Sequence, residues 1–200
     1  MKVIPLSKNP HIYSCNSYLI LGDWNRIEDI NTLIDPGTDS YVHEEIDRIP
    51  TGFGKVAVEQ IILTHNHFDH AGSIMDLKSR FGAKVFAFVD MAGVDELLLH
   101  GSFIKAGDDY LEILHAPGHS SDSICLYCQS KKSLFSGDMQ LRVRTAGGAY
   151  TQEYLDSLLM LYGREIETVY SGHDEPLTLN VREILAETIR NVRRSDVAPG

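Results

Sequence analysis

The sequence predicts an α/β fold, in which short buried strands alternate with amphipathic helices. Apolar runs of about four to eight residues, bounded by glycine, proline or asparagine, recur along the chain and are typical of strands. Stretches with apolar residues three or four positions apart follow several of these runs and are typical of helices. Strands followed by a helix are loosely repeated in the two halves, and 200 residues suit a single domain, residues 1–200, with a full core.

The first half of the chain begins with strand patterns. Strands are predicted at residues 3–6, 17–21 and 31–35, and the segment that joins the first two is too long for a tight hairpin turn. Valine and isoleucine at helical spacing predict a helix within residues 37–50. The remaining elements predicted for this half are a buried strand at 56–63, a helix at 74–81, a strand at 83–88 and a helix after Asp90.

The second half is predicted to hold strands first and helices later. Apolar alternation predicts a strand at 110–115, and two further strands at 123–129 and 133–136 are joined by a hairpin turn. Residues 139–150 have little apolar period and predict a mobile loop. The predicted order then ends with a helix at 153–161, a strand at 168–171, a helix at 181–192 and a frayed tail at 195–200.

Bulk properties argue against several classes of protein. The formal net charge of -10 at pH 7 argues against a general nucleic-acid-binding surface, so a small-molecule substrate is the expected partner. No run approaches the roughly 20 apolar residues of a membrane-spanning helix, so no membrane partner is expected. The N-terminus has no secretory signal pattern and the cysteines number three, which together predict a cytoplasmic protein with reduced thiols. Composition does not decide between a monomer and a homo-oligomer.

Histidine and aspartate residues gather at the predicted strand ends, where α/β folds place their chemistry. Four of them fall within six residues between a buried strand and a helix, and three more each follow a glycine. Imidazole nitrogens and carboxylate oxygens are ligands for zinc and similar first-row ions. A histidine-rich surface loop is the alternative, but four such groups together have little structural benefit without a metal. The residues are His65, His67, Asp69 and His70, then His119, Asp138 and His173.

These donors are too numerous for one tetrahedral ion and predict two metal ions. The first ion would be held by His65, His67 and His119. The second would be held by Asp69, His70 and His173. Asp138 would bridge the two ions, because a carboxylate has two oxygens. Such a pair can share a hydroxide and clamp the attacking and leaving oxygens of a substrate.

The motifs T-H-x-H-x-D-H, P-G-H, F-S-G-D and S-G-H, with N-S-Y-L-I and L-I-D-P-G upstream, resemble those of the metallo-β-lactamase superfamily over nearly the whole chain. The resemblance implies a four-layer αββα sandwich, in which two mixed β-sheets are flanked by helices. It also implies the ligand roles given above. Asp69 would bind the second ion and orient the nucleophilic water, and Asp35 would support a ligand from behind.

Within this superfamily the pattern is similar to the glyoxalase II-like branch, since β-lactamases often have cysteine where this chain has Asp138. The resemblance implies a metallo-hydrolase, hydroxyacylglutathione hydrolase-like, with Asp69 and Asp138 as catalytic residues. A hydroxide shared by two divalent ions, zinc first and iron or manganese as alternatives, would cleave a small ester, thioester or related acyl substrate. The C-terminal helical extension of glyoxalase II enzymes is not expected here, which leaves glutathione specificity open.

Two other functions are compatible with the same motifs. Persulfide dioxygenases use a single iron held by two histidines and one aspartate, and the matching residues here are His65, His119 and Asp138. A non-catalytic metal-binding or sensing protein on this fold is the weaker alternative, because every ligand position is filled.

Two loops are best placed to cover a metal centre at the strand ends. His11 and Tyr13 belong to the loop between the first two predicted strands, and Arg142 and Arg144 belong to the loop predicted at 139–150. All four are predicted to contact the substrate, and the guanidinium groups suit a carboxylate or phosphate. Ordinary surface positions are the alternative for both loops.

The cysteines are not expected to take part in the chemistry. Cys125 and Cys128 have C-x-x-C spacing, but residues three apart on a strand face opposite sides, which argues against a redox or zinc pair. Cys15 is also predicted to lie in strand-like surroundings away from the motif loops. Direct attack by water, without a covalent acyl-enzyme, is therefore the expected mechanism.

Overall fold

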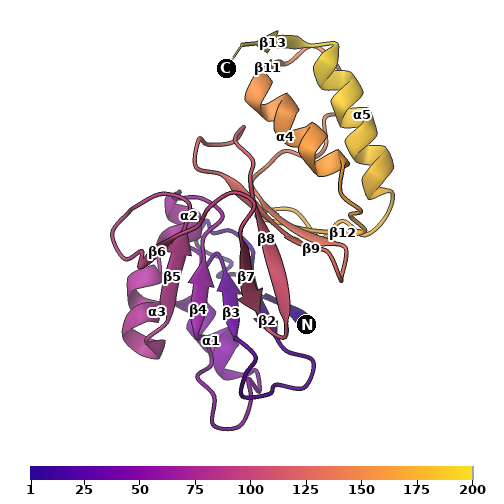
Figure 1. Ribbon diagram of the computed structural model, residues 1–200. Helices are drawn as coiled ribbons and strands as arrows, with labels where there is room; N and C mark the ends of the chain where they lie inside the picture. Colours follow the sequence, from indigo (N-terminus) through magenta and orange to yellow (C-terminus); the bar gives the residue numbers. More distant parts are fainter. Residues whose placement is uncertain (200) are drawn as a thin grey trace.

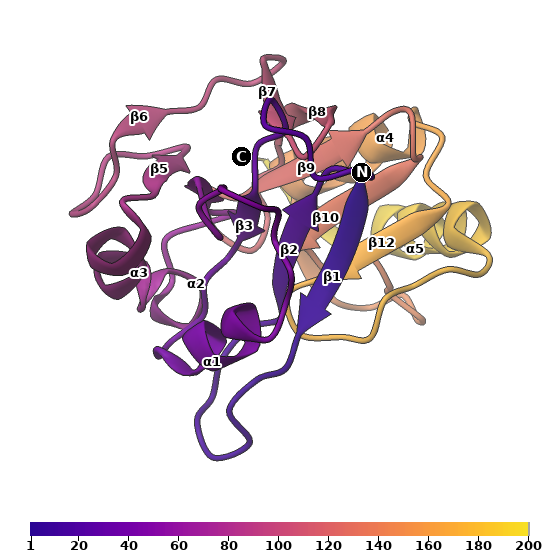
Figure 2. The same cartoon turned by 90° about the horizontal axis from the view of Figure 1, so that it is seen from below.

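The computed structural model describes residues 1–199 and contains two large β-sheets with helices on their outer sides (Figure 1). The first sheet and helices α1 to α3 come from the first half of the chain. The second sheet and helices α4 and α5 come from the second half, drawn in salmon to yellow. Figure 2 shows the same division from below. The predicted fold, two mixed sheets flanked by helices, is confirmed.

The first sheet has six strands in the order β1-β2-β3-β4-β5-β6. Strands β1 to β3 are antiparallel, and β3 to β6 are parallel. Because β3 and β4 are parallel neighbours, the residues that follow them meet at one edge of the sheet. The strands are β1 (Lys2–Leu6), β2 (Ser17–Leu21), β3 (Thr32–Ile34), β4 (Gln60–Ile62), β5 (Lys84–Ala87) and β6 (Glu96–Leu97).

The second sheet has five strands in the order β12-β10-β9-β8-β7. All neighbours are antiparallel except β10 and β12, which are parallel. The ends of β10 and β12 therefore lie side by side, and the Gly172 N–H donates to the Gly137 carbonyl at 2.8 Å. The strands are β7 (Phe103–Ala106), β8 (Asp109–His115), β9 (Ile124–Cys128), β10 (Ser133–Gly137) and β12 (Thr168–Ser171).

Apolar side chains along one face of each helix hold the helices against the sheets. Val42, Ile46 and Leu77 pack on the first sheet, in one cluster of buried side chains. A second cluster lies between the sheets and includes Ile62 and Phe135. No helix within residues 1–199 has both the length and the apolar character needed to cross a membrane. The helices are α1 (Tyr41–Asp47), α2 (Phe68–Ala71), α3 (Ile74–Phe81), α4 (Gln152–Tyr162) and α5 (Val181–Arg193).

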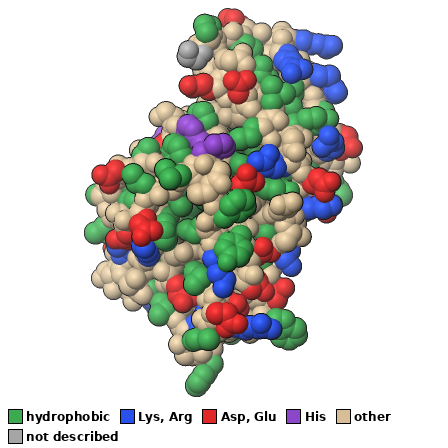
Figure 3. Space-filling view, viewed as in Figure 1, with side chains coloured by type: hydrophobic (Ala, Val, Ile, Leu, Met, Phe, Trp, Pro, Cys, Tyr) green, Lys and Arg blue, Asp and Glu red, His purple; other side chains and the backbone are tan. Residues whose placement is uncertain are grey.

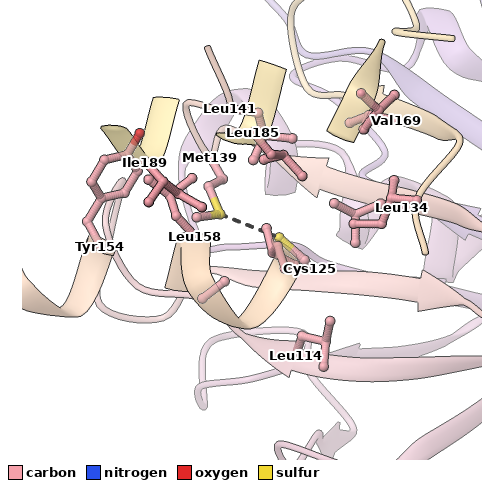
Figure 4. Packing of buried hydrophobic residues seen from close by; sticks show 14 of the residues in the cluster. Leu114, Cys125, Leu134, Met139, Leu141, Tyr154, Leu158, Val169, Leu185 and Ile189 are labelled. Atoms are coloured by element: carbon pink, nitrogen blue, oxygen red, sulfur yellow. Dashed lines mark hydrogen bonds between the residues drawn. The ribbon is translucent and has the colours of Figure 1, made fainter. Parts of the chain in front are cut away.

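Helices α4 and α5 cover the outer face of the second sheet. Figure 4 shows Leu158 of α4 and Ile189 of α5 beside Cys125 and Met139, in the cluster that also contains Leu134 of β10. Fully burying an aliphatic side chain stabilises a fold by about 1.5–3 kcal/mol, so this cluster fixes the layer strongly. Cys125 belongs to this cluster, whereas Cys128 belongs to the cluster between the sheets, as their strand spacing predicted.

The helix predicted after Asp90 is wrong. Turns and the short strand β6 occupy this segment, and β6 pairs with β5. Gly93 has φ +96°, which interrupts a helix. The carboxylate of Asp95 accepts hydrogen bonds from the Val85 N–H at 2.8 Å and from Lys78 Nζ at 2.7 Å. These tertiary contacts hold the segment against the sheet edge, and β7, which follows it, was not predicted.

The frayed C-terminal tail is also a wrong prediction for the described residues. Strand β13 (Asp196–Ala198) pairs in parallel with β11 (Ala149–Thr151), and Tyr150 lies opposite Val197. Val197 packs against the same core as α4 and α5, which explains the order. Gly200 lies outside the described residues.

The segment before β11 is irregular, as predicted, but it is tightly packed. Leu141 and Val143 are buried in the core under α5. Thr188 of α5 donates to the Leu141 carbonyl at 2.9 Å and accepts from the Val143 N–H at 3.0 Å. Because side chains alternate along an extended segment, Arg142 and Arg144 point to the opposite, exposed side.

Candidate metal centre

The first four predicted donors lie between the end of β4 and helix α2. His65 follows β4, and His67 is the N-cap residue directly before α2. Asp69 and His70 lie within this single helical turn, where a loop had been predicted. The helical turn gives the side chains of Asp69 and His70 different directions from those of His65 and His67. This short stretch can therefore supply ligands to two separate groups of metal-binding residues.

The other three donors follow tight glycine turns in the second half of the chain. Gly137 has φ +50°, and a Cβ there would lie 2.6 Å from Thr64 Oγ1. A Cβ at Gly172 would lie 2.2 Å from Asp138 Oδ1. Glycine at both positions therefore lets the ends of β10 and β12 approach the β4 loop closely enough to complete the centre.

One group consists of three imidazoles. The ligand atoms of His65, His67 and His119 all lie within 4.8 Å of one another. His119 Nε2 and His67 Nδ1 are 3.0 Å apart. His65 is buried, whereas His67 and His119 are exposed, and Figure 3 shows histidine side chains gathered on the surface between the two halves. We call this group the histidine cluster.

The other group combines carboxylates and imidazoles. Asp69, His70, Asp138 and His173 also bring their ligand atoms within 4.8 Å of one another. His173 Nε2 lies 3.1 Å from Asp69 Oδ2, and His70 Nε2 lies 3.1 Å from Asp138 Oδ1. Asp69 and His70 are buried, and the other two are half-buried. We call this group the mixed cluster.

Asp138 lies between the two clusters. Its Oδ2 atom is 3.3 Å from His173 Nε2 in the mixed cluster and 3.6 Å from His119 Nε2 in the histidine cluster. The structure thus brings together all seven residues in the grouping that the sequence predicted, with one carboxylate facing both groups.

Asp35 organises the atoms behind the clusters. Its Oδ2 accepts hydrogen bonds from Thr64 Oγ1 at 2.7 Å and from His70 Nδ1 at 2.9 Å, and its Oδ1 accepts from the Thr64 N–H at 2.7 Å. Thr64 Oγ1 is also 3.0 Å from His65 Nδ1. This network places a proton on Nδ1 of both His65 and His70 and directs both Nε2 atoms at the clusters.

Three buried polar atoms at this place have no hydrogen-bond partner: His65 Nε2, His70 Nε2 and Asp138 Oδ1. Although His70 Nε2 and Asp138 Oδ1 are close, they are misaligned for a hydrogen bond. Buried polar atoms are rarely left without a partner, because their desolvation is costly. Bound cations would satisfy all three, and the donor set of imidazoles and carboxylates suits zinc, iron or manganese. The residues therefore fit a pair of divalent ions.

The electrostatics of the centre differ between the clusters. Burial, with the nearby positive charge of His70, lowers the pKa of His65 to about 4, which keeps its imidazole neutral. Burial opposes a charge on His70, but Asp35 and Asp138 outweigh it and raise the pKa of His70. Burial also opposes the charge on Asp138, but contact with His70 lowers its pKa to about 2. A cation in the mixed cluster would displace the proton that these carboxylates favour on His70.

The four residues predicted to contact the substrate differ in how close they lie to the centre. Arg142 and Arg144 line a cavity of about 590 Å³ together with His119, Asp138 and His173. That cavity is an open hollow directly beside the metal centre.

Tyr13 and His11 belong to one loop but differ in position. The Tyr13 hydroxyl lies 3.4 Å from His173 Nε2. His11 is exposed, and its backbone N–H donates to Asn9 Oδ1 at 3.0 Å. Within residues 1–199, neither Tyr13 nor His11 lines the two cavities at the centre, but Tyr13 contacts a predicted ligand and His11 does not.

Sequence reasoning misplaced Cys15. Its thiol is fully buried, and its Sγ lies within 4.8 Å of ligand atoms of Asp35 and His70. Its N–H also donates to the Asp69 carbonyl at 3.1 Å. Cys15 therefore supports the mixed cluster from beneath, and a strand pattern alone gave no signal of this contact.

A second cavity, of about 440 Å³, was not predicted. It shares His119 and Asp138 with the first cavity, and its wall includes Tyr150, Tyr154 and Ala198. Tyr150 and Tyr154 are stacked, with ring centroids 5.4 Å apart. Pairing of β11 with β13 builds this wall, so the misassigned tail hid it from sequence reasoning.

Known proteins share both the sequence pattern and the fold. A hydroxyacylglutathione hydrolase of Bradyrhizobium sp. (strain ORS 278) is 32% identical over 122 residues, which cover 57% of this chain and 48% of the relative. A hydroxyacylglutathione hydrolase of Pelagibacter ubique (strain HTCC1062) is 28% identical over 171 residues, or 79% of this chain and 66% of the relative. The matched region thus spans about half to two thirds of these relatives.

A solved structure, that of ETHE1 from Myxococcus xanthus, superposes with a TM-score of 0.71 at 25% identity, covering 97% of this chain and 84% of that chain. The family model of the metallo-beta-lactamase superfamily matches residues 12–90 and 87–173. These ranges contain every residue of both clusters. The chain therefore belongs to the metallo-beta-lactamase superfamily.

Proposed function

We propose that this chain is a metal-dependent hydrolase of small thioesters or esters. The observation that carries the proposal is the set of buried, unpartnered ligand atoms shared between two clusters that Asp138 joins. Divalent ions held there would lower the pKa of a water molecule toward about 7 and stabilise negative charge on an acyl oxygen. The relatives named hydroxyacylglutathione hydrolases support a thioester, because an acylglutathione is one.

Two carboxylates of the mixed cluster, and Asp35 behind it, have separate roles in this proposal. Asp69 is buried beside His173 and can accept a hydrogen bond from the attacking water, which sets the direction of attack. Asp138 faces both clusters and holds them at a fixed separation. Asp35 accepts a hydrogen bond from His70 Nδ1–H and fixes the orientation of that ring.

No side chain near the centre is proposed to attack the substrate. Burial raises the pKa of the Cys15 thiol, and it raises the pKa of Cys125 to about 12. Both thiols are therefore protonated near neutral pH and are poor nucleophiles. Water is left as the nucleophile, and no covalent acyl-enzyme is expected.

The cavity that contains Arg142 and Arg144 is proposed to hold an anionic arm of the substrate. Neither guanidinium forms an ion pair with an acidic side chain within residues 1–199, where Asp174 and Glu175 also line the cavity. Guanidinium groups bind carboxylates or phosphates with two parallel hydrogen bonds. A carboxylate-bearing thioester is therefore the proposed substrate class.

A single experiment tests the reaction type. The metal-loaded protein is mixed with S-lactoylglutathione in water enriched in oxygen-18, under single-turnover conditions. We expect the label in the acid product, no burst of thiol release and no acylated protein by mass spectrometry. A burst with an acylated side chain would contradict direct water attack. Iron-dependent oxygen consumption with glutathione persulfide, far faster than any hydrolysis, would instead assign the chain to a dioxygenase.

A further inference from the structure

The phenol of Tyr13 lies at the edge of the mixed cluster. Its ring stacks on the imidazole of His173, with centroids 5.2 Å apart and an interplanar angle of 17°. Its hydroxyl oxygen is 3.4 Å from His173 Nε2. That nitrogen lies 3.1 Å from Asp69 Oδ2 and 3.3 Å from Asp138 Oδ2. The hydroxyl is therefore next to the atoms that would hold a cation.

The backbone around Tyr13 is tied to both halves of the centre. The Tyr13 carbonyl accepts a hydrogen bond from Thr38 Oγ1 at 2.6 Å. The Cys15 N–H donates to the Asp69 carbonyl at 3.1 Å, and the Asn16 N–H donates to the Gly172 carbonyl at 2.6 Å. These bonds reach helix α2, which carries Asp69 and His70, and the loop before His173, so the phenol is positioned in advance.

The ring of Tyr13 is also open to a ligand. Its side chain is 65% exposed, as is that of Phe68. The two ring centroids are 6.3 Å apart, so together they form an aromatic edge beside the centre. Both rings are therefore accessible from solvent beside the centre.

The hydrogen-bonding capacity of the phenol suggests its role. A tyrosine hydroxyl has one hydrogen to donate. Without a cation, His173 Nε2 can accept it; if His173 Nε2 held a cation, the Tyr13 hydroxyl would be free to donate to another acceptor. We propose that this acceptor is the acyl oxygen of the substrate, which Tyr13 stabilises through a hydrogen bond as negative charge develops. The inference rests on the proposed hydrolase function, and Tyr13 acts in it only as a hydrogen-bond donor.

The test compares Tyr13→Phe with Tyr110→Phe, which removes a hydroxyl from an exposed tyrosine at the start of β8. For S-lactoylglutathione hydrolysis we expect Tyr13→Phe to lower kcat by about 10²-fold with little change in KM, because the bond strengthens in the transition state. Inorganic phosphate, a tetrahedral oxyanion, serves as a probe that needs no turnover. We expect its Kd, measured by calorimetry on the loaded protein, to rise about tenfold in Tyr13→Phe. Tyr110→Phe should match the wild type in both measurements.

Three results would overturn the inference or separate it from the proposed function. A Tyr13→Phe protein with wild-type kcat and phosphate affinity would overturn it. Loss of a metal ion from Tyr13→Phe, measured by elemental analysis, would overturn it in favour of a role in metal binding. If the wild type hydrolyses no thioester but phosphate affinity still depends on the Tyr13 hydroxyl, the proposed function fails while the oxyanion contact stands.

Discussion

The two clusters both contain histidine ligands but are built differently. The histidine cluster has no carboxylate of its own, and His67 and His119 are exposed. The mixed cluster has two carboxylates, and its Asp69 and His70 are buried. Asp35 and Cys15 lie directly behind it. One cluster is therefore a set of three imidazoles, two of them exposed, and the other combines carboxylates with imidazoles and is embedded in a hydrogen-bonded interior.

This difference determines how each cluster should respond to change. Burial holds His65 neutral, so this ligand of the histidine cluster can bind a cation without losing a proton. In the mixed cluster the carboxylates raise the pKa of His70, so a cation must compete with a proton there. Substitutions of the exposed histidines should therefore affect metal binding by the histidine cluster. Substitutions in the buried surroundings of Asp69 and His70 should affect metal binding by the mixed cluster.

The largest effect is expected where the clusters meet. Asp138→Ala removes the carboxylate that faces both groups, so both cations should bind more weakly and thioester hydrolysis should fall to the rate without enzyme. Hydrolysis and metal content are measured together, with circular dichroism to show that the fold is retained. Rates near those of the wild type in Asp138→Ala would contradict the bridging role.

A substitution in one cluster should weaken the binding of only the metal ion that this cluster holds. The fully loaded wild type is expected to contain two ions per chain, because the donors form two groups. His119→Ala should weaken only the ion of the histidine cluster, and His173→Ala only that of the mixed cluster. In a titration with chelator-buffered metal, each variant would then show one of its two binding steps shifted to a higher concentration of free metal. A wild-type plateau at one ion would disprove the dinuclear centre.

The support behind the mixed cluster should have a smaller and selective effect. Asp35→Asn removes the charge that holds His70 Nδ1–H but keeps the size of the side chain. Asparagine also tolerates the left-handed backbone of this residue, φ +49°. We expect the affinity of the mixed cluster for its ion to fall about 10- to 100-fold, which is typical for loss of such a partner. Equal weakening of both binding steps in the same titration would contradict this selectivity.

The same comparison explains why the sequence predicted so much of the centre. Strand ends and glycine turns are local signals, so His65, His119, Asp138 and His173 could be placed at one edge of the fold from their flanking residues. Parallel pairing of β3 with β4 and of β10 with β12 then brings those ends together. The fold and the grouping of the donors follow from patterns a few residues long.

The contacts that sequence reasoning missed are between distant segments. Cys15 contacts the mixed cluster only because the loop after β1 bonds to Asp69, and no local pattern predicts that bond. The wall formed by Tyr150 depends on pairing of Val197 with β11, across nearly 50 residues. The helix predicted after Asp90 failed for the same reason, because contacts with β5 and α3 override its spacing.

The smallest expected effect concerns substrate choice, outside both clusters. Arg142 and Arg144 project from a segment that Thr188 and Asn191 of α5 hold in place, so their removal should not disturb the metal ligands. For each arginine-to-alanine variant we expect kcat/KM for a carboxylate-bearing thioester to fall about tenfold, roughly the loss of one charged hydrogen bond. An uncharged thioester of similar size should be hydrolysed at the wild-type rate. Arg190→Ala, on the exposed side of α5, is the matched control and should change neither substrate. Equal losses for charged and uncharged substrates would mean that these guanidinium groups act on the fold of the segment and not on the anionic arm.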